Sequence, residues 1–369
     1  MTSLRQTWLK HRWRSSLVIV VAAVTALAVA LSAVVSRLWL DDEATRDRLD
    51  PSFQRGITIP RQIGTQSYTA ADATWASDIG SITPSTGADW VQIAFVLTQP
   101  DSSSTQPVVD SALSATPDSL LAGIRAAHAH QLKVFVVPLL LLSAPEQLTA
   151  WRGTVDPGSS QWYARWFSAY RTALDPYLTA AQAGGAEQFA VGTELEALEA
   201  NAPAPAWTSL IASIRSAYSG RLTYDMNWSS MARAVPGWMR DPTLSALGVS
   251  DYTPLTSSGG DTAESVRRVW DERVGTLLDQ LHERSGRPIF LSEVGFRYTE
   301  NSFDQRWLEK DPVNSTLDLH RQAMAFDAVL AAVAAKPWIT GVFCWGWVDV
   351  GQFQLKGTPA AATIKAWFR

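Results

Sequence analysis

The chain contains a single cysteine, Cys344, among its 369 residues, which excludes any intrachain disulfide. Charged residues are also few, at 18% against 46% hydrophobic residues, and this balance excludes a globally disordered chain. The net charge is −4 and no stripe of basic residues lies outside the N-terminus, so we do not expect nucleic acid as a partner. The five histidines lack the spacing of metal ligands, and we therefore expect no metal site. A chain of this length can build a large hydrophobic core and needs neither a disulfide nor a bound metal to fold.

One long hydrophobic run is present near the N-terminus. Residues 15–36 carry no charge and are long enough to cross a bilayer as one helix. A basic segment, residues 1–14, precedes this run, and a polar linker with acidic residues, 37–55, follows it. This order of charge places the first segment in the cytoplasm and sends the rest of the chain outside. The small-residue sites Ala28-Val-Ala30 and Leu31-Ser-Ala33 leave a second reading open, in which the segment is a cleaved signal peptide and the protein is secreted.

The remainder, residues 56–369, alternates short apolar runs with longer amphipathic stretches. The short runs are almost continuously hydrophobic, which is typical of strands that are covered on both faces. Eight runs are predicted as strands, at 56–60, 90–97, 133–140, 188–192, 222–228, 247–252, 288–293 and 339–345. Six stretches are predicted as helices, at 117–131, 161–183, 207–218, 264–284, 317–335 and 359–368. This alternation predicts an α/β fold, a (β/α)8 barrel. A doubly wound open sheet is the alternative, but such sheets usually carry a glycine-rich phosphate loop, and the sequence has none.

Polar and aromatic residues gather where these strands end, which is the face of a barrel that carries catalytic side chains. Glu194 follows the 188–192 run, and Glu293 ends the 288–293 run. Because a carboxylate is costly to bury, two of them at strand ends indicate a catalytic pair. The other strand ends supply residues that we predict to bind substrate, namely Thr193, Asn227, Trp228, Tyr252, Trp345 and Trp347. The chain has 17 tryptophans, and although most must pack in the core, an indole also matches the apolar face of a sugar ring.

Two such carboxyl groups suit glycoside hydrolysis with retention of configuration. Glu194 is predicted to be the acid/base, with a pKa raised by burial and by the charge of its partner. Glu293 is predicted to be the nucleophile and to stay ionised. Tyr252 is predicted to orient Glu293, Asn227 to bind a sugar hydroxyl, and Trp345 to support the sugar that is attacked.

These residues resemble a known group of enzymes. Glu194, Glu293 within Leu-Ser-Glu-Val-Gly-Phe, and Trp345 resemble clan A of the retaining glycoside hydrolases. Within that clan, the segments Gly-Thr-Glu-Leu and Ser-Glu-Val-Gly-Phe-Arg resemble glycoside hydrolase family 113, whose characterised members are endo-β-1,4-mannanases. The resemblance covers about residues 56–369. It implies a (β/α)8 fold, no cofactor, a polysaccharide or oligosaccharide substrate such as β-1,4-mannan, and the same roles for both glutamates.

The sequence departs from the clan pattern at one position. Many members have asparagine directly before the acid/base, where it binds the 2-hydroxyl of the attacked sugar, and here that position is Thr193. A threonine hydroxyl is shorter and reaches the same group only by closer approach or through water.

Three alternatives stay open at this stage. Glu196 is an alternative candidate for the acid/base, whereas Glu199 is predicted to be a solvated charge in a loop. The chain could also be a carbohydrate-binding protein of the cell envelope with weak or no activity. A third reading is a transglycosylase that acts on exopolysaccharide with the same two glutamates.

Overall fold

The structure of the protein is a computed structural model, and it describes one compact unit that begins at Leu49. The described residues are 49–60, 74–110, 113–256, 262–308, 315–348 and 351–369. The predicted transmembrane segment, 15–36, lies outside them. Within the described ranges no helix combines the length and the apolar character needed to span a bilayer.

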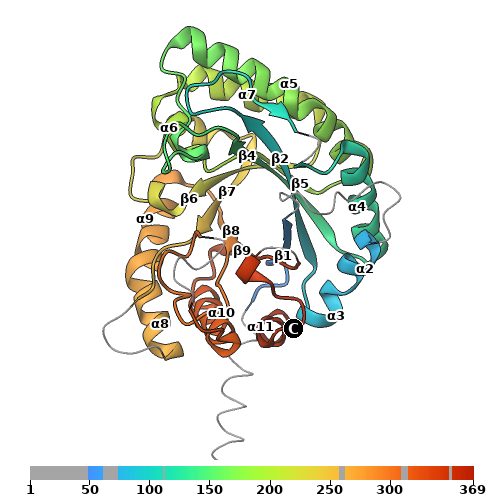
Figure 1. Ribbon diagram of the computed structural model, residues 1–369, viewed down its shortest axis with the longest axis vertical. Helices are drawn as coiled ribbons and strands as arrows, with labels where there is room; N and C mark the ends of the chain where they lie inside the picture. The colour runs from blue at the N-terminus through green and yellow to red at the C-terminus, as the bar shows by residue number, and fades with distance from the viewer. Residues whose placement is uncertain (1–48, 61–73, 111–112, 257–261, 309–314, 349–350) are drawn as a thin grey trace, which may run out of the picture. The chain divides into compact units, whose positions relative to one another are not determined.

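Eight parallel strands form a closed barrel, which confirms the prediction (Figure 1). They are β1 (Gln54–Pro60), β2 (Trp90–Gln99), β4 (Lys133–Leu142), β5 (Gln188–Thr193), β6 (Arg221–Asn227), β7 (Leu244–Asp251), β8 (Ile289–Val294) and β9 (Ile339–Trp345). Each pairs with the next, and β1 closes the ring by pairing with both β2 and β9. Gly56 stands at this seam, opposite Trp90 on one side and Phe343 on the other. A side chain at Gly56 would collide with the Phe343 ring, so the seam needs a glycine. A short strand, β3 (Val108–Val109), runs antiparallel to the end of β2.

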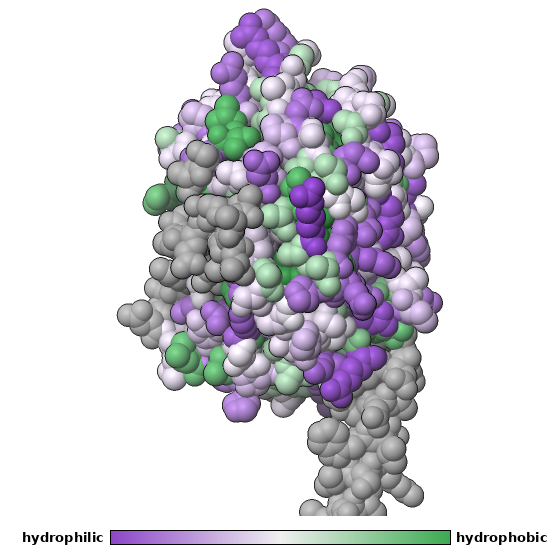
Figure 2. Space-filling view, turned by 90° about the vertical axis from the view of Figure 1, so that its right-hand side faces the viewer, coloured by the Kyte–Doolittle hydropathy of each residue, from purple (hydrophilic) through white to green (hydrophobic). Residues whose placement is uncertain are grey.

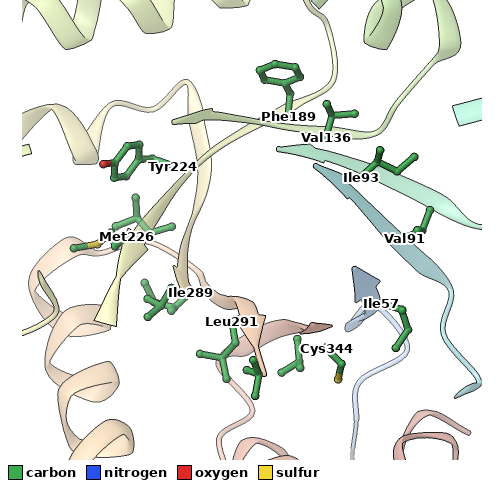
Figure 3. Close-up of a cluster of buried hydrophobic side chains, with 14 of the residues drawn as sticks. Ile57, Val91, Ile93, Val136, Phe189, Tyr224, Met226, Ile289, Leu291 and Cys344 are labelled. Carbon is green, nitrogen blue, oxygen red and sulfur yellow. The ribbon is translucent and has the colours of Figure 1, made fainter. Parts of the chain in front are cut away.

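The alternation of side chains along each strand divides the core in two. On β2, Trp90 and Ala94 face the barrel interior together with Phe135 and Phe343. Val91 and other alternate residues belong to a larger cluster between the strands and the helices. Figure 3 shows ten labelled members of this outer cluster on the strands, from Ile57 on β1 to Cys344 on β9. Because the strands are buried on both faces, their sequences are continuously hydrophobic, which is why the eight runs could be predicted within three residues.

Helices surround the strands in Figure 1. They are α2 (Thr74–Gly80), α3 (Ile82–Thr86), α4 (Pro117–Ala129), α5 (Ser160–Gly184), α6 (Glu196–Asn201), α7 (Ala204–Ala217), α8 (Ala263–Trp270), α9 (Thr276–Ser285), α10 (Leu319–Ala334) and α11 (Pro359–Phe368). Local signals set several ends: Thr116 caps α4 by accepting from the Ser119 amide at 3.1 Å. Gly185 and Gly286 end α5 and α9 in the left-handed conformation. The predicted helix 264–284 is interrupted, since a π-helical turn, Asp271–Gly275, joins α8 to α9.

The strand pairing is irregular at several points along the barrel. The register shifts between Ala190 and Thr193 on β5, and between Val249 and Ser250 on β7. Such shifts bend a strand and redirect the side chains that follow. On the face shown in Figure 2, hydrophobic and hydrophilic residues are interspersed. The shift on β5 lies directly before Glu194, and the shift on β7 lies level with Glu293 on β8.

Candidate active site

Glu194 stands directly after β5, where the register has just shifted. Its backbone adopts φ +55°, in the left-handed region that favours glycine. Its amide donates to the Asp225 carbonyl on β6 at 2.7 Å, which holds this conformation in place. The chain thus accepts local strain to direct this side chain away from the regular strand.

Both oxygens of the Glu194 carboxylate have a polar neighbour. The Asn227 amide donates to Oε1 at 2.9 Å. The Arg152 guanidinium Nε lies 3.1 Å from Oε2 and forms an ion pair. Only 4% of Glu194 is exposed, so these two contacts act on the carboxylate with little screening by water.

Glu293, near the end of β8, is the second buried carboxylate, with 3% exposed. The Tyr252 hydroxyl, one residue beyond β7, donates to its Oε2 at 3.0 Å. Among the described residues, Oε1 of Glu293 has no hydrogen-bond partner although it is buried. An unpaired buried oxygen is costly to keep, so Oε1 is the atom available to a bound molecule.

Both carboxyl groups have raised pKa values, and the charge of Glu194 acts on Glu293. Burial raises the pKa of Glu194, while Arg152 and the Asn227 hydrogen bond lower it. Burial also raises the pKa of Glu293 well above its usual range, and the negative charge of Glu194 raises it further. Like charges this close disfavour double ionisation, so the pair favours a state with one proton. With one proton between them, one carboxyl group can act as an acid while the other is an anion.

A third buried carboxyl group, Asp225 on β6, belongs to the same electrostatic cluster. Burial raises the pKa of Asp225 well above its usual range, and the charge of Glu194 adds to the effect. The charge of Asp225 in turn raises the pKa of Glu293. The sequence offered one signal for it, a lone aspartate inside the apolar 222–228 run.

The structure gathers five of the six predicted binding residues around this pair. Thr193 directly precedes Glu194 and is buried, and its hydroxyl has no partner among the described residues. Asn227 contacts Glu194, and Tyr252 contacts Glu293. Tyr252 and Trp345 belong to the interior aromatic cluster, against which Trp228 packs. Because Tyr252 also contacts Glu293, we call Trp228, Tyr252 and Trp345 the aromatic wall of the site.

Trp347 does not join this group, which corrects its prediction as a binding residue. It is fully buried and belongs to the outer cluster between strands and helices. Its indole N–H donates to the Asp78 carbonyl at 3.0 Å and to the Ser81 hydroxyl oxygen at 3.2 Å. A buried indole has no free face for a ligand, so Trp347 anchors the end of β9 to α2 and the residue that follows it.

Two further glutamates follow Glu194 on α6. The Glu196 carboxylate accepts from Arg233 at 3.0 Å. Glu199 is buried rather than solvated, so that reading was wrong. Its carboxylate accepts from the Tyr224 hydroxyl at 2.7 Å, and burial raises the pKa of Glu199 to about 7. The Tyr224 hydroxyl accepts in turn from the amide that directly follows Glu194, at 3.2 Å.

Sequence reasoning missed two residues beside the site. Arg152 lies in a 3-10 turn, Arg152–Thr154, between β4 and α5. Trp307 lies between β8 and α10 and stacks on Trp228. Both belong to loops, where no periodicity connects a residue to a barrel strand. Within the described part of the chain, no group of three or more His, Cys, Asp or Glu side chains could hold a metal ion.

Comparison with known proteins gives one family. The model of glycoside hydrolase family 113 matches residues 65–362. A search among curated proteins finds no match.

Several solved structures share the fold. One is a GH113 β-1,4-mannanase, at 21% identity and TM-score 0.71, covering 86% of this chain and 98% of that one. The GH113 β-mannanase from Alicyclobacillus acidocaldarius has 24% identity, with the same coverage and TM-score. A β-glucuronidase from Ruminococcus gnavus is more distant, at 10% identity and TM-score 0.57, covering 86% of this chain and 50% of that one.

Proposed function

We propose a function on an established premise: the chain belongs to glycoside hydrolase family 113 and is a glycoside hydrolase. The proposed reaction is cleavage of a β-linked hexose polysaccharide with retention of configuration. In this proposal Glu194 is the acid/base and Glu293 is the nucleophile. The single observation that carries it is a pair of buried carboxyl groups with raised pKa values, in which the charge of Glu194 acts on Glu293 and each group holds a different polar partner.

The first step uses the protonated Glu194 and the ionised Glu293. Glu293 attacks the anomeric carbon through Oε1, the oxygen that Tyr252 leaves open, while the glycosidic C–O bond breaks. The leaving oxygen takes its proton from Glu194, and the product is a glycosyl ester of Glu293. No charge is left on Glu293 at that point.

The second step reverses the direction of proton transfer. Once Glu293 is esterified, Glu194 loses the neighbouring negative charge, and the Arg152 guanidinium favours its carboxylate form. Glu194 then takes a proton from water as that water attacks the anomeric carbon and the ester bond breaks. One pair of carboxyl groups thereby completes both displacements.

The substrate we propose is β-1,4-mannan, cleaved within the chain. Two solved family 113 structures of this fold bear the name mannanase. The aromatic wall of Trp228, Tyr252 and Trp345 suits the apolar faces of sugar rings. Thr193 takes the position where a 2-hydroxyl is bound in many clan members, and we propose it for that contact.

The first experiment compares the wild type with Glu293→Ala on β-1,4-mannan, by release of reducing ends. Glu196→Gln is the matched control, because it alters the nearest rival carboxylate that Arg233 already binds. We expect activity from the wild type and the control and none from Glu293→Ala. Equal background release by all three would contradict hydrolysis, and products longer than the substrate would indicate transglycosylation.

A second experiment assigns the roles. An activated aryl β-mannobioside is offered with azide to Glu194→Ala and Glu293→Ala. If Glu194 is the acid/base, its variant still forms the glycosyl ester, and azide gives a product of retained configuration. If Glu293 is the nucleophile, its variant gives the inverted azide instead. NMR of the two products distinguishes the assignments, and the opposite pattern would exchange them.

A further inference from the structure

Trp307 is a large aromatic side chain that remains 49% exposed. It stacks on Trp228, with ring centroids 6.1 Å apart and the planes inclined by 26°. Two stacked indoles, one of them half in water, form an exposed aromatic patch, and exposed apolar patches often mark binding sites.

Two buried arginines that precede Trp307 in the chain hold the loop that carries it. Arg297 and Arg306 are each 1% exposed. Arg297 donates to the carbonyls of Asn301, Asp304, Gln305 and Leu308, at 2.8–3.0 Å. Arg306 donates to the carbonyls of Asp251 and Thr253, at 2.9 and 2.8 Å. The exposure of Trp307 is therefore built into an anchored loop.

The anchoring also places this loop against the candidate site. Arg306 binds the backbone of Asp251, which directly precedes Tyr252. Trp228 directly follows Asn227, the residue that donates to Glu194. The stacked pair thus extends the aromatic wall outward from the two glutamates.

We propose that Trp307, backed by Trp228, is a distal sugar-binding platform that stacks a sugar unit of the bound polysaccharide away from the bond being cleaved. The proposal rests on the proposed function and adds to it a preference for long chains. An indole held in place offers a sugar a flat apolar surface with little ordering entropy left to lose. Oligosaccharides too short to reach Trp307 gain nothing from it.

The test compares Trp307→Ala with Trp338→Ala. Trp338 is a suitable control because it also stacks on an aromatic ring, His282, at 4.8 Å. It directly precedes β9 and so lies at the opposite end of the barrel from the glutamates. The value of kcat/KM is measured on an aryl β-mannobioside and on mannotetraose to mannohexaose. Trp307→Ala should lose about three- to tenfold on mannohexaose, by the usual size of aromatic contacts, and nothing on the aryl disaccharide. Trp338→Ala should follow the wild type throughout.

An equal loss at every length would assign Trp307 a structural role and overturn the proposal, as would no loss on mannohexaose. Calorimetric binding by Glu293→Ala, with and without Trp307→Ala, separates this inference from the proposed function. Mannohexaose and cellohexaose are the probes. Weaker binding without Trp307 supports the platform even if the wild type hydrolyses neither sugar. Equal affinities, or no binding of either sugar, overturn it.

Discussion

Replacing Arg152 by methionine should move the whole pH profile of activity upward. The guanidinium Nε lies 3.1 Å from the Glu194 carboxylate, and the two side chains are 17% and 5% exposed. Arg152 lowers the pKa of Glu194 and also that of Glu293. Replacing Arg152 should therefore raise the pKa values of both glutamates.

The size of the shift follows from the contact. A carboxylate beside an arginine has its pKa lowered by about 1–3 units. Because Arg152 is partly open to water, we expect the lower part of this range, about one to two pH units. The proposed mechanism needs one proton on the pair, so the two limbs of the kcat/KM profile report the two macroscopic pKa values of the pair. Both limbs should move to higher pH.

The assay is kcat/KM on a manno-oligosaccharide from pH 4 to about 10. Arg233→Met is the matched control, since that guanidinium lies 3.0 Å from Glu196 and is 51% exposed. The control profile should stay close to the wild type. An Arg152→Met profile that superimposes on the wild type, or moves to lower pH, would refute this role of Arg152.

Three further predictions follow from other contacts. Tyr252→Phe removes the hydrogen bond to Glu293 Oε2, and a bond of this kind to a charged group contributes about 1.5–3 kcal/mol. Steady-state kcat/KM should therefore fall about ten- to hundredfold. Circular dichroism should show that the fold is intact. The pKa of Glu199 is raised to about 7 in the folded protein, so this group favours the folded state below pH 4.5 and loses that effect as pH rises through 7. Glu199→Gln should therefore gain on the order of 3 kcal/mol over the wild type between pH 5 and pH 8 in urea unfolding, and parallel curves for the two proteins would contradict this. For the N-terminal segment, the sequence predicts that the full chain sediments with membranes and that a chain starting at residue 37 does not. Recovery of both chains in the same fraction would contradict the prediction that residues 15–36 anchor the protein.

Much of the barrel could be predicted because its physical cause is local. A strand buried on both faces must be continuously hydrophobic, and the eight runs carry that pattern. The same reasoning placed Glu194 and Glu293 at one end, because parallel strands all end there. The predicted contact of Tyr252 with Glu293 is present in the structure.

The residues that were missed or misassigned depend on how the chain turns after leaving a strand. Trp345 and Trp347 are two residues apart, which predicts the same face while the strand continues. β9 ends at Trp345, and Trp347 turns into the outer cluster. Glu199 was read as a loop charge, but the short helix α6 brings it under Tyr224. Arg152 reaches Glu194 from a loop whose conformation no short pattern encodes.

The left-handed backbone at Glu194 has a consequence for the stability of the protein. Glycine at this position would relieve the strain, by about 1–2 kcal/mol, and would also remove a buried carboxylate. Glu194→Gly would therefore give a more stable protein that lacks the proposed acid/base. In the proposed mechanism, the strain at Glu194 is therefore a stability cost that is coupled to the acid/base role of this residue.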